Sequence, residues 1–194
     1  MAKQSGKITN KSSNKLRIIG GQWRSRQLPF PDVQGLRPTT DRVRETVFNW
    51  LMPYLPGANV LDVFAGSGAL GFEALSREAD NAVLLEKDSK AAKMLKENTA
   101  LLKANAQVFQ TDSLNWLQTC DTQFDVIFLD PPFNKGLLPN CIETIESKGL
   151  LADKGWIYIE SEADLSELNI PSSWHMHRDK KAGQVKLRLF QKLS

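Results

Sequence analysis

A glycine-rich turn between an apolar run and a helical pattern constrains the fold of this 194-residue chain more than any other feature. The mostly apolar run from Val60 to Phe64 predicts a short buried strand, and Gly66, Gly68 and Gly71 follow it where a helical pattern begins. Glycine lets the backbone turn tightly and lets a ligand come close, while the first N–H groups of a helix are free to bind it. A strand, a glycine turn and a helix in this order predict the ligand-binding unit of an α/β fold.

Strand and helix patterns alternate after this turn. The strand patterns lie at residues 82–86, 107–110, 125–130 and 156–160, and the helical patterns at 88–103, 114–117 and 138–147. Residues 174–178 and 185–190 flank a Lys-Ala-Gly turn, which predicts a closing antiparallel hairpin. Before the first strand, Asp41 is the expected cap of one more helix, whose inner face carries Val43, Val47, Trp50 and Leu51. This alternation predicts an α/β, Rossmann-like fold with a seven-stranded, mostly parallel sheet and a C-terminal antiparallel hairpin.

Basic residues are concentrated at the front of the chain. Residues 1–44 hold ten Lys and Arg against two Asp, so the rest of the chain, whose total charge is +3, is net negative. We therefore divide the chain into a disordered basic tail (1–15), a basic N-terminal RNA-binding extension (16–44) and a catalytic domain (45–194). Salt bridges to the acidic body are the alternative role for the basic residues of the extension. Those that we expect to contact phosphates are Arg24, Arg26, Arg37, Arg42 and Arg44.

Several classes of protein are excluded by what the sequence lacks. No run approaches the roughly 18 apolar residues of a membrane span, and the first residues do not resemble a signal peptide, so we expect a soluble, cytoplasmic protein without a membrane partner. Cys120 and Cys141 form no CxxC pair, and His175 and His177 have no third ligand nearby in the sequence, so no metal site is expected. The tryptophans are expected to serve the core, and Trp23, inside the basic segment, is the one whose stacking on a base is worth testing.

The cofactor of such a sheet binds beyond the carboxyl ends of its strands. Glu86 ends the second strand, 20 residues beyond Gly66, where a carboxylate can accept both hydroxyls of a ribose. Asp112 follows the third strand and could accept a hydrogen bond from an adenine amino group, although capping the next helix explains it equally well. These features alone fit NAD, FAD or S-adenosylmethionine. The residues expected to bind the cofactor are Asp62, Phe64, Gly66, Gly68, Glu86, Asp112 and Ser113.

The sequence Asp130-Pro131-Pro132-Phe133 distinguishes between these cofactors. An apolar strand ends here in a carboxylate, two residues without an N–H group and an aromatic ring. A carboxylate beside unpaired carbonyl groups accepts hydrogen bonds from an amino group, and Phe133 can stack on the planar ring that bears this group. Hydride transfer requires no such arrangement, so Asp130, Pro131 and Phe133 are the expected catalytic residues, and a simple strand-ending turn is the alternative.

At these residues the chain resembles class I S-adenosylmethionine-dependent methyltransferases, of which the DPPF sequence marks the branch that methylates amino nitrogens. The Gly20–Leu28, Leu36–Phe48 and Gly183–Arg188 segments are similar to those of the bacterial RsmD family, and the resemblance covers about residues 16 to 192. Members of that family methylate N2 of a guanine in 16S rRNA, in the head of the small ribosomal subunit.

The resemblance implies S-adenosylmethionine as the cofactor. It also implies 16S rRNA as the substrate, within the small subunit or an assembly intermediate, and a monomeric enzyme. Two alternatives remain open: an amino methyltransferase for adenine N6 or a glutamine side chain, and a non-enzymatic RNA-binding assembly factor. The glycines of the turn together with Glu86 and Asp130 argue against the second alternative.

Overall fold

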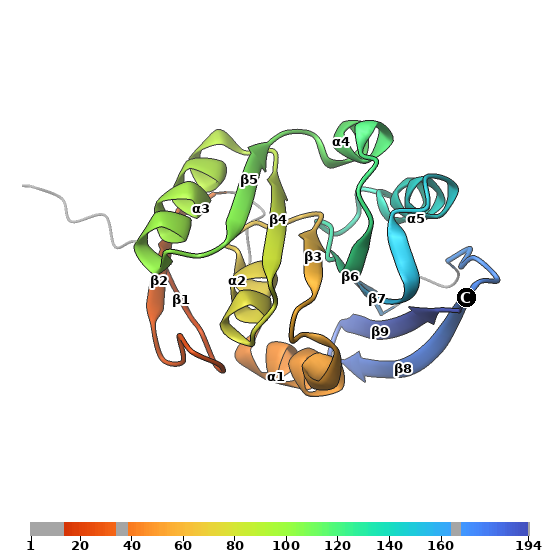
Figure 1. Ribbon diagram of the computed structural model, residues 1–194, viewed down its shortest axis with the longest axis horizontal. Coiled ribbons are helices and arrows are strands. Elements are labelled where there is room, and N and C mark those ends of the chain that lie inside the picture. Colours follow the sequence, from red (N-terminus) through yellow and green to blue (C-terminus); the bar gives the residue numbers. More distant parts are fainter. Residues whose placement is uncertain (1–13, 34–38, 164–167, 194) are drawn as a thin grey trace, which may run out of the picture.

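The computed structural model describes residues 14–33, 39–163 and 168–193. Its centre is a seven-stranded sheet in the order β5-β4-β3-β6-β7-β9-β8 (Figure 1). The strands from β5 to β7 are parallel to one another, whereas β9 is antiparallel to both β7 and β8. From β3 the chain first adds β4 and β5 on one side and then β6 and β7 on the other. The carboxyl ends of β3 and β6 therefore flank the switch point at which such sheets bind ligands. The predicted fold is confirmed.

The elements follow the predicted alternation closely. The strands of the large sheet are β3 (Asn59–Asp62), β4 (Asn81–Glu86), β5 (Ala106–Gln110), β6 (Phe124–Leu129), β7 (Leu151–Glu162), β8 (Trp174–Ala182) and β9 (Val185–Lys192). A separate antiparallel pair consists of β1 (Asn14–Arg17) and β2 (Gln27–Phe30). The helices are α1 (Asp41–Leu51), α2 (Ala69–Ser76), α3 (Ser89–Leu102), α4 (Ser113–Thr119) and α5 (Leu138–Ser147), with a short 3₁₀ turn (Met52–Tyr54) after α1.

Helices cover both faces of the sheet, because successive strand residues point to opposite sides. Val126 and Phe128 of β6 belong to the core formed with α1, α2, α3 and the β1–β2 pair. Ile127 and Leu129 belong to the core formed with α4 and α5. Each buried strand is therefore apolar on both faces, as expected of a covered parallel sheet. No helix in the described ranges is long and apolar enough to cross a membrane.

The beginning of α1 differs from the sequence prediction. Thr40, not Asp41, is the N-cap, because Thr40 has extended backbone and its hydroxyl accepts a hydrogen bond from the N–H group of Val43. The Asp41 carboxylate instead binds Arg17 and Arg44. The α1 helix also continues across the boundary that we set between residues 44 and 45. The basic extension therefore shares one core with the sheet, to which it contributes Leu16, Ile18, Trp23, Leu28, Phe30 and Val43, while the proposed tail lies mostly outside the described residues.

Arg44 is a structural residue rather than a phosphate ligand. Its side chain is only 1% exposed, and its guanidinium group lies 3.5 Å from the carboxylate of Glu73, which is itself fully buried in α2. The same guanidinium donates a 2.8 Å hydrogen bond to the carbonyl oxygen of Arg17. Glu73 also binds Arg77 and the N–H group of Ile19. This network joins the N-terminal segment, α1 and α2, so the prediction that Arg44 contacts RNA was wrong.

We predict that Arg44→Ala lowers the free energy of unfolding by about 3 to 5 kcal/mol, because removing one partner leaves the buried Glu73 carboxylate incompletely compensated. Urea denaturation measures this change. Arg42→Ala is the matched control on the same helix. Arg42 is exposed and forms no ion pair with a described residue, so its removal should change stability by no more than about 0.5 kcal/mol. Equal effects of the two substitutions would contradict the role given to the Arg44 network.

Candidate active site

The carboxyl edge of the parallel sheet gathers most of the predicted site residues. Asp62 ends β3, and Asp130 follows β6 directly. Asp62 lies two residues after Val60, and Asp130 lies two residues after Phe128, so each side chain points to the same face of the sheet as that residue. This is the face covered by α1. The cofactor residues on β3 and β4 and the catalytic sequence after β6 are thus brought to one edge, as predicted.

The glycine turn is held by the carboxylate of Glu86. The N–H group of Gly66 donates a 2.9 Å hydrogen bond to Glu86 Oε2, and the N–H group of Asp88 donates a 2.7 Å bond to Oε1. Gly66 and Gly68 have φ angles of 54° and 81°, which favour glycine. A Cβ atom on Gly68 would lie 2.4 Å from the ring of Phe72, so part of the glycine pattern serves packing. Since the Gly66 N–H group already binds Glu86, it is not free for a pyrophosphate, and burial raises the pKa of Glu86.

Asp62 is a buried carboxylate with unused hydrogen-bonding capacity. Its Oδ2 atom accepts a 3.0 Å bond from the N–H group of Gly71, while Oδ1 has no partner among the described residues. Burial raises the pKa of Asp62 to about 7, and the nearby carboxylate of Glu86 adds to the shift. An orphaned, buried oxygen beside the glycine turn is suited to a ligand that donates a hydrogen bond or carries a positive charge.

The remaining predicted cofactor residues have structural partners. Asp112 caps α4 by accepting a bond from the N–H group of Asn115, and it pairs with Lys87 at 3.1 Å, which lowers the pKa of Asp112. The hydroxyl of Ser113 donates a 2.6 Å bond to the carbonyl oxygen of Val63 and so ties α4 to the end of β3. The half-buried Phe64 packs against the core on the α5 side. Capping therefore accounts for Asp112, and its contact with an adenine stays a prediction.

Asp130 lies half-buried beside the switch point and accepts a 2.9 Å hydrogen bond from the hydroxyl of Thr39. Burial, followed by the charges of Glu160 and Asp62, raises the pKa of Asp130 well above its usual range. Pro131 is buried, whereas the Phe133 side chain is 42% exposed and accessible to a planar ligand. The loop is anchored one residue later, where the N–H group of Asn134 donates to the carboxylate of Glu162.

Sequence reasoning missed a second carboxylate beside Asp130. The pairing of Leu129 with Ile159 places Asp130 next to Glu160 of β7. Glu160 is buried and accepts a 2.7 Å hydrogen bond from the hydroxyl of Tyr158, and burial raises its pKa as well. The signal in the sequence was an acidic residue at the end of the apolar run 156–159.

The predicted phosphate ligands are separated in space. Arg24 and Arg26 lie on the turn before β2, where Gln22 hydrogen-bonds to Ser76 at the end of α2. This eight-residue helix starts at the glycine turn, so the two arginines lie roughly 12 Å or more from the cofactor residues along the helix axis. Arg42 is exposed near the start of α1, and Arg37 lies outside the described residues. Trp23 is only 9% exposed and packs in the core like a structural tryptophan, so the structure does not offer its ring to a base.

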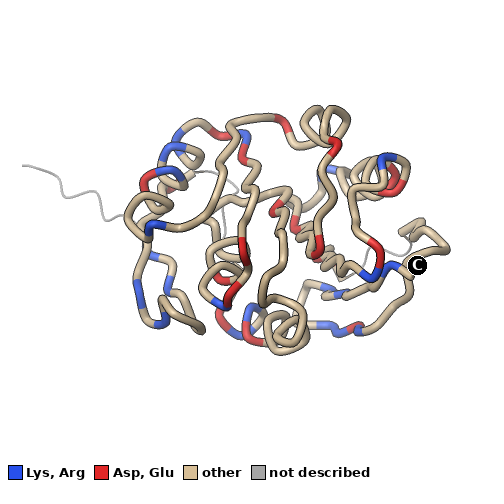
Figure 2. Tube along the Cα trace, in the orientation of Figure 1, with Lys and Arg blue, Asp and Glu red and all other residues tan. Residues whose placement is uncertain are grey.

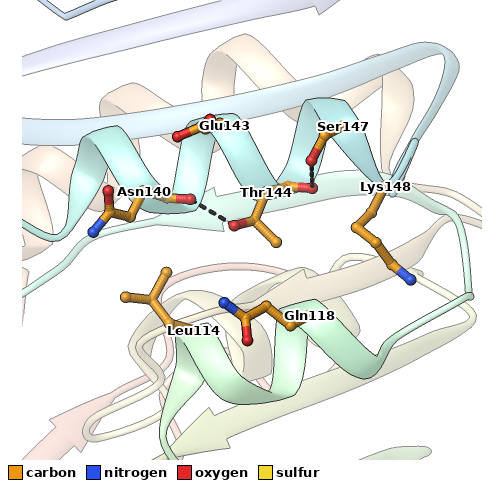
Figure 3. A pocket seen from close by; sticks show the side chains of 7 residues that line it. All are labelled: Leu114, Gln118, Asn140, Glu143, Thr144, Ser147 and Lys148. Atoms are coloured by element: carbon orange, nitrogen blue, oxygen red, sulfur yellow. Dashed lines mark hydrogen bonds between the residues drawn. The ribbon is translucent and has the colours of Figure 1, made fainter.

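A separate pocket of about 420 Å³ lies between α4 and α5 (Figure 3). It contains none of the predicted site residues. Its walls are mainly neutral and polar, and two of its side chains bond to backbone oxygens of α5. Within the described ranges, no group of three or more His, Cys, Asp or Glu residues is arranged to hold a metal ion. The carboxyl edge of the sheet is therefore the candidate active site.

Comparison with known proteins agrees with this geometry. The family described as "Conserved hypothetical protein 95", the RsmD family, matches residues 16–191. The chain belongs to this family. It is 51% identical to ribosomal RNA small subunit methyltransferase D of Escherichia coli K12 over 96% of this chain and 94% of that protein. The Haemophilus influenzae protein of the same name is 45% identical over 94% and 97% of the two chains. The solved structure of the Escherichia coli protein yhhF is 49% identical, with a TM-score of 0.88 over 93% of this chain and 99% of that one.

The raised pKa of Asp62 gives a pH-dependent prediction about stability. Burial raises the pKa of Asp62 from 3.8 to about 7, so between these pH values the carboxyl stays protonated in the folded protein but ionises in the unfolded chain, and the fold loses stability as the pH rises. Asp62→Asn cannot ionise. We therefore expect this variant to gain stability relative to the original protein as the pH rises from 5 to 8, by about 2 to 3 kcal/mol. Denaturation at both pH values measures the gain, and a difference that does not change with pH would contradict the shift.

Proposed function

We propose that the protein transfers a methyl group from S-adenosylmethionine to the exocyclic N2 of a guanine in 16S rRNA. The observation that carries this proposal is the half-buried Asp130 carboxylate at the switch point, followed by two prolines and the exposed ring of Phe133. The names of the relatives support a ribosomal RNA of the small subunit as the substrate. The hydrogen-bond acceptors around Asp130 support an amino nitrogen as the group that receives the methyl. The family resemblance supports N2 of guanine as that nitrogen.

The cofactor residues fit S-adenosylmethionine. Glu86 can accept bonds from the ribose hydroxyls with the lone pairs that the backbone leaves free. Asp62, with its orphaned oxygen, can receive a bond from the ammonium group of the methionine part. Asp112, just after the neighbouring strand β5, can accept a hydrogen bond from the adenine amino group. When bound, S-adenosylmethionine supplies a methyl group that is already activated by its sulfonium.

The residues around Asp130 prepare the nucleophile. A guanine amino group is a weak nucleophile because its lone pair is delocalised into the ring. Asp130 and the carbonyl oxygen of Pro131 hold the two amino hydrogens, so the nitrogen can pyramidalise and direct its lone pair at the methyl group. The same acceptors stabilise the positive charge that develops on the nitrogen. When the N–CH₃ bond forms and the S–CH₃ bond breaks, Asp130 is in position to take up the proton released from the nitrogen.

The acceptor base must leave its stack to reach this pocket. Leaving the stack costs a few kcal/mol, and less for a base in a loop. Phe133, which is 42% exposed beside Asp130, recovers part of this cost by stacking on the base. We propose that the protein works as a monomer on the small subunit or on an assembly intermediate, where the surrounding RNA presents the base.

Labelled methyl transfer tests the proposal. Small subunits from cells that lack the enzyme, naked 16S rRNA, DNA and protein are incubated in parallel with the labelled cofactor, and the modified nucleotide is mapped. Label at N2 of one guanine of the small subunit is the expected result. Label on adenine N6 or on glutamine would support another amino methyltransferase. RNA binding without any transfer would support an assembly factor.

We predict that Asp130→Ala lowers kcat by about 10²-fold or more, since it removes an acceptor for the charge that forms in the transition state. The affinity for S-adenosylmethionine, measured by calorimetry, should change little. Asp121→Ala is the matched control, because Asp121 is 87% exposed before the opposite end of β6 and pairs only with Lys148 among described residues. A variant without Asp130 that retains nearly normal turnover would refute the assignment.

A further inference from the structure

Basic residues also occur at the end of the C-terminal hairpin, outside the extension that the sequence favoured for RNA binding. Arg178, Lys180 and Lys181 are exposed on β8 and form no ion pair with any described carboxylate. Lys186 of β9 does pair, with Asp179 at 3.1 Å. Blue positions recur along β8 and β9 where the hairpin approaches α1 (Figure 2). The net negative charge of the chain after residue 44 hides this local excess of cations.

The strand register brings these lysines to the active-site edge of the sheet. Lys180 pairs with Leu187, which pairs with Glu160, so the three residues form one row across β8, β9 and β7. Asp130 lies beside Glu160 on the next strand. Neighbouring strands are about 4.8 Å apart, so the backbone at Lys180 lies roughly 14 Å from that at Asp130, about two phosphate spacings along a strand of nucleic acid.

The α1 helix continues the same basic surface. The ammonium group of Lys180 lies 3.4 Å from the hydroxyl of Thr46, whose own hydroxyl bonds to the carbonyl oxygen of Arg42 one turn earlier. Arg42 and Lys180 are both exposed. Arg178 and Lys180 pair with Leu189 and Leu187 of the core on the α1 side, whereas Lys181 points to the opposite face of the sheet. We call the surface formed by Arg42, Arg178 and Lys180 the hairpin rim. It lies close to the carboxyl edge at Asp130, unlike Arg24 and Arg26, which lie at the far end of α2.

We propose that the hairpin rim binds the phosphates of the RNA strand that flank the target nucleotide. This proposal rests on the proposed function and adds a surface to it. The carboxyl edge itself is acidic, with Asp62 and Glu160 buried and Asp130 half-buried there, so an approaching polyanion is repelled unless cations lie beside this edge. Lysines on an edge strand also prevent strands from pairing between molecules. Preventing such pairing does not require the lysines to lie at the active-site end of the sheet or next to Arg42 of α1.

The double substitution Arg178→Ala with Lys180→Ala tests the rim. If each of these side chains neutralises one phosphate, the slope of log K against log salt falls by about 0.7 to 0.9 per contact. The loss of RNA affinity between 50 and 200 mM salt should then be about tenfold smaller than for the original protein. We expect KM for small subunits to rise, while kcat at saturation and the affinity for S-adenosylmethionine stay the same. Arg178→Lys with Lys180→Arg keeps the charge and should retain binding.

The control is Lys93→Ala with Lys96→Ala, which removes the same charge from the exposed side of α3. The α3 helix packs beside β5, six strand positions or roughly 29 Å away from β8. An unchanged salt slope in the β8 variant, or an equal loss in the α3 variant, would overturn the rim. Methyl transfer by the original protein is measured first. If it transfers no methyl group to RNA, the proposed function fails, whereas transfer with an unchanged slope in the variant refutes only the rim.

Discussion

The gathering of carboxylates at one edge of the sheet is the constraint on which the rest of the site depends. A carboxylate lies at or near the carboxyl end of each of the five parallel strands, and these are Asp112, Glu86, Asp62, Asp130 and Glu160. Asp62 and Glu160 are buried, whereas Glu86, Asp130 and Asp112 are partly exposed. Burying charges of one sign together is unfavourable unless hydrogen bonds compensate, and here backbone N–H groups and hydroxyls supply most of them. Such an edge prefers ligands that donate hydrogen bonds or carry positive charge. Ribose hydroxyls, amino groups and a sulfonium meet this preference, and a pyrophosphate does not.

The N-terminal segment completes the core as well as contributing charge. Leu16, Ile18, Leu28 and Phe30 are buried against the same side of the sheet as α1, and Arg44 reaches inward to Glu73. The hydroxyl of Thr39 then donates a hydrogen bond to the Asp130 carboxylate and so connects this segment to the candidate active site. A segment that both covers the core and touches Asp130 transmits its position to the active site, so RNA contacts on its outer surface can be coupled to the orientation of the acceptor group.

The sequence was sufficient to predict the fold and the position of the site because both depend on local patterns. The glycine turn, the alternating apolar runs and the DPPF sequence each specify a short stretch of backbone, and the parallel sheet brings them to one edge. The partners of individual charges were not predictable, because they depend on side chains far apart in the chain. Arg44 looked like its exposed neighbour Arg42, and only the position of Glu73, 29 residues away, shows that it is buried. The role of Glu160 likewise depends on the register between β6 and β7.

Under the proposed function, the separation of charge would treat the base and the backbone of the RNA differently. An acidic edge favours the donor groups of a base and repels phosphate, so a nucleotide would enter base first, with its phosphates held outside. The hairpin rim lies about three strand spacings from Asp130, far enough to leave room for an extruded base between them. Phe133, exposed beside this path, offers the base a stacking surface at the entrance. In the proposed function, the acidic edge, the exposed ring of Phe133 and the basic rim would together select for an unstacked base on a phosphate backbone.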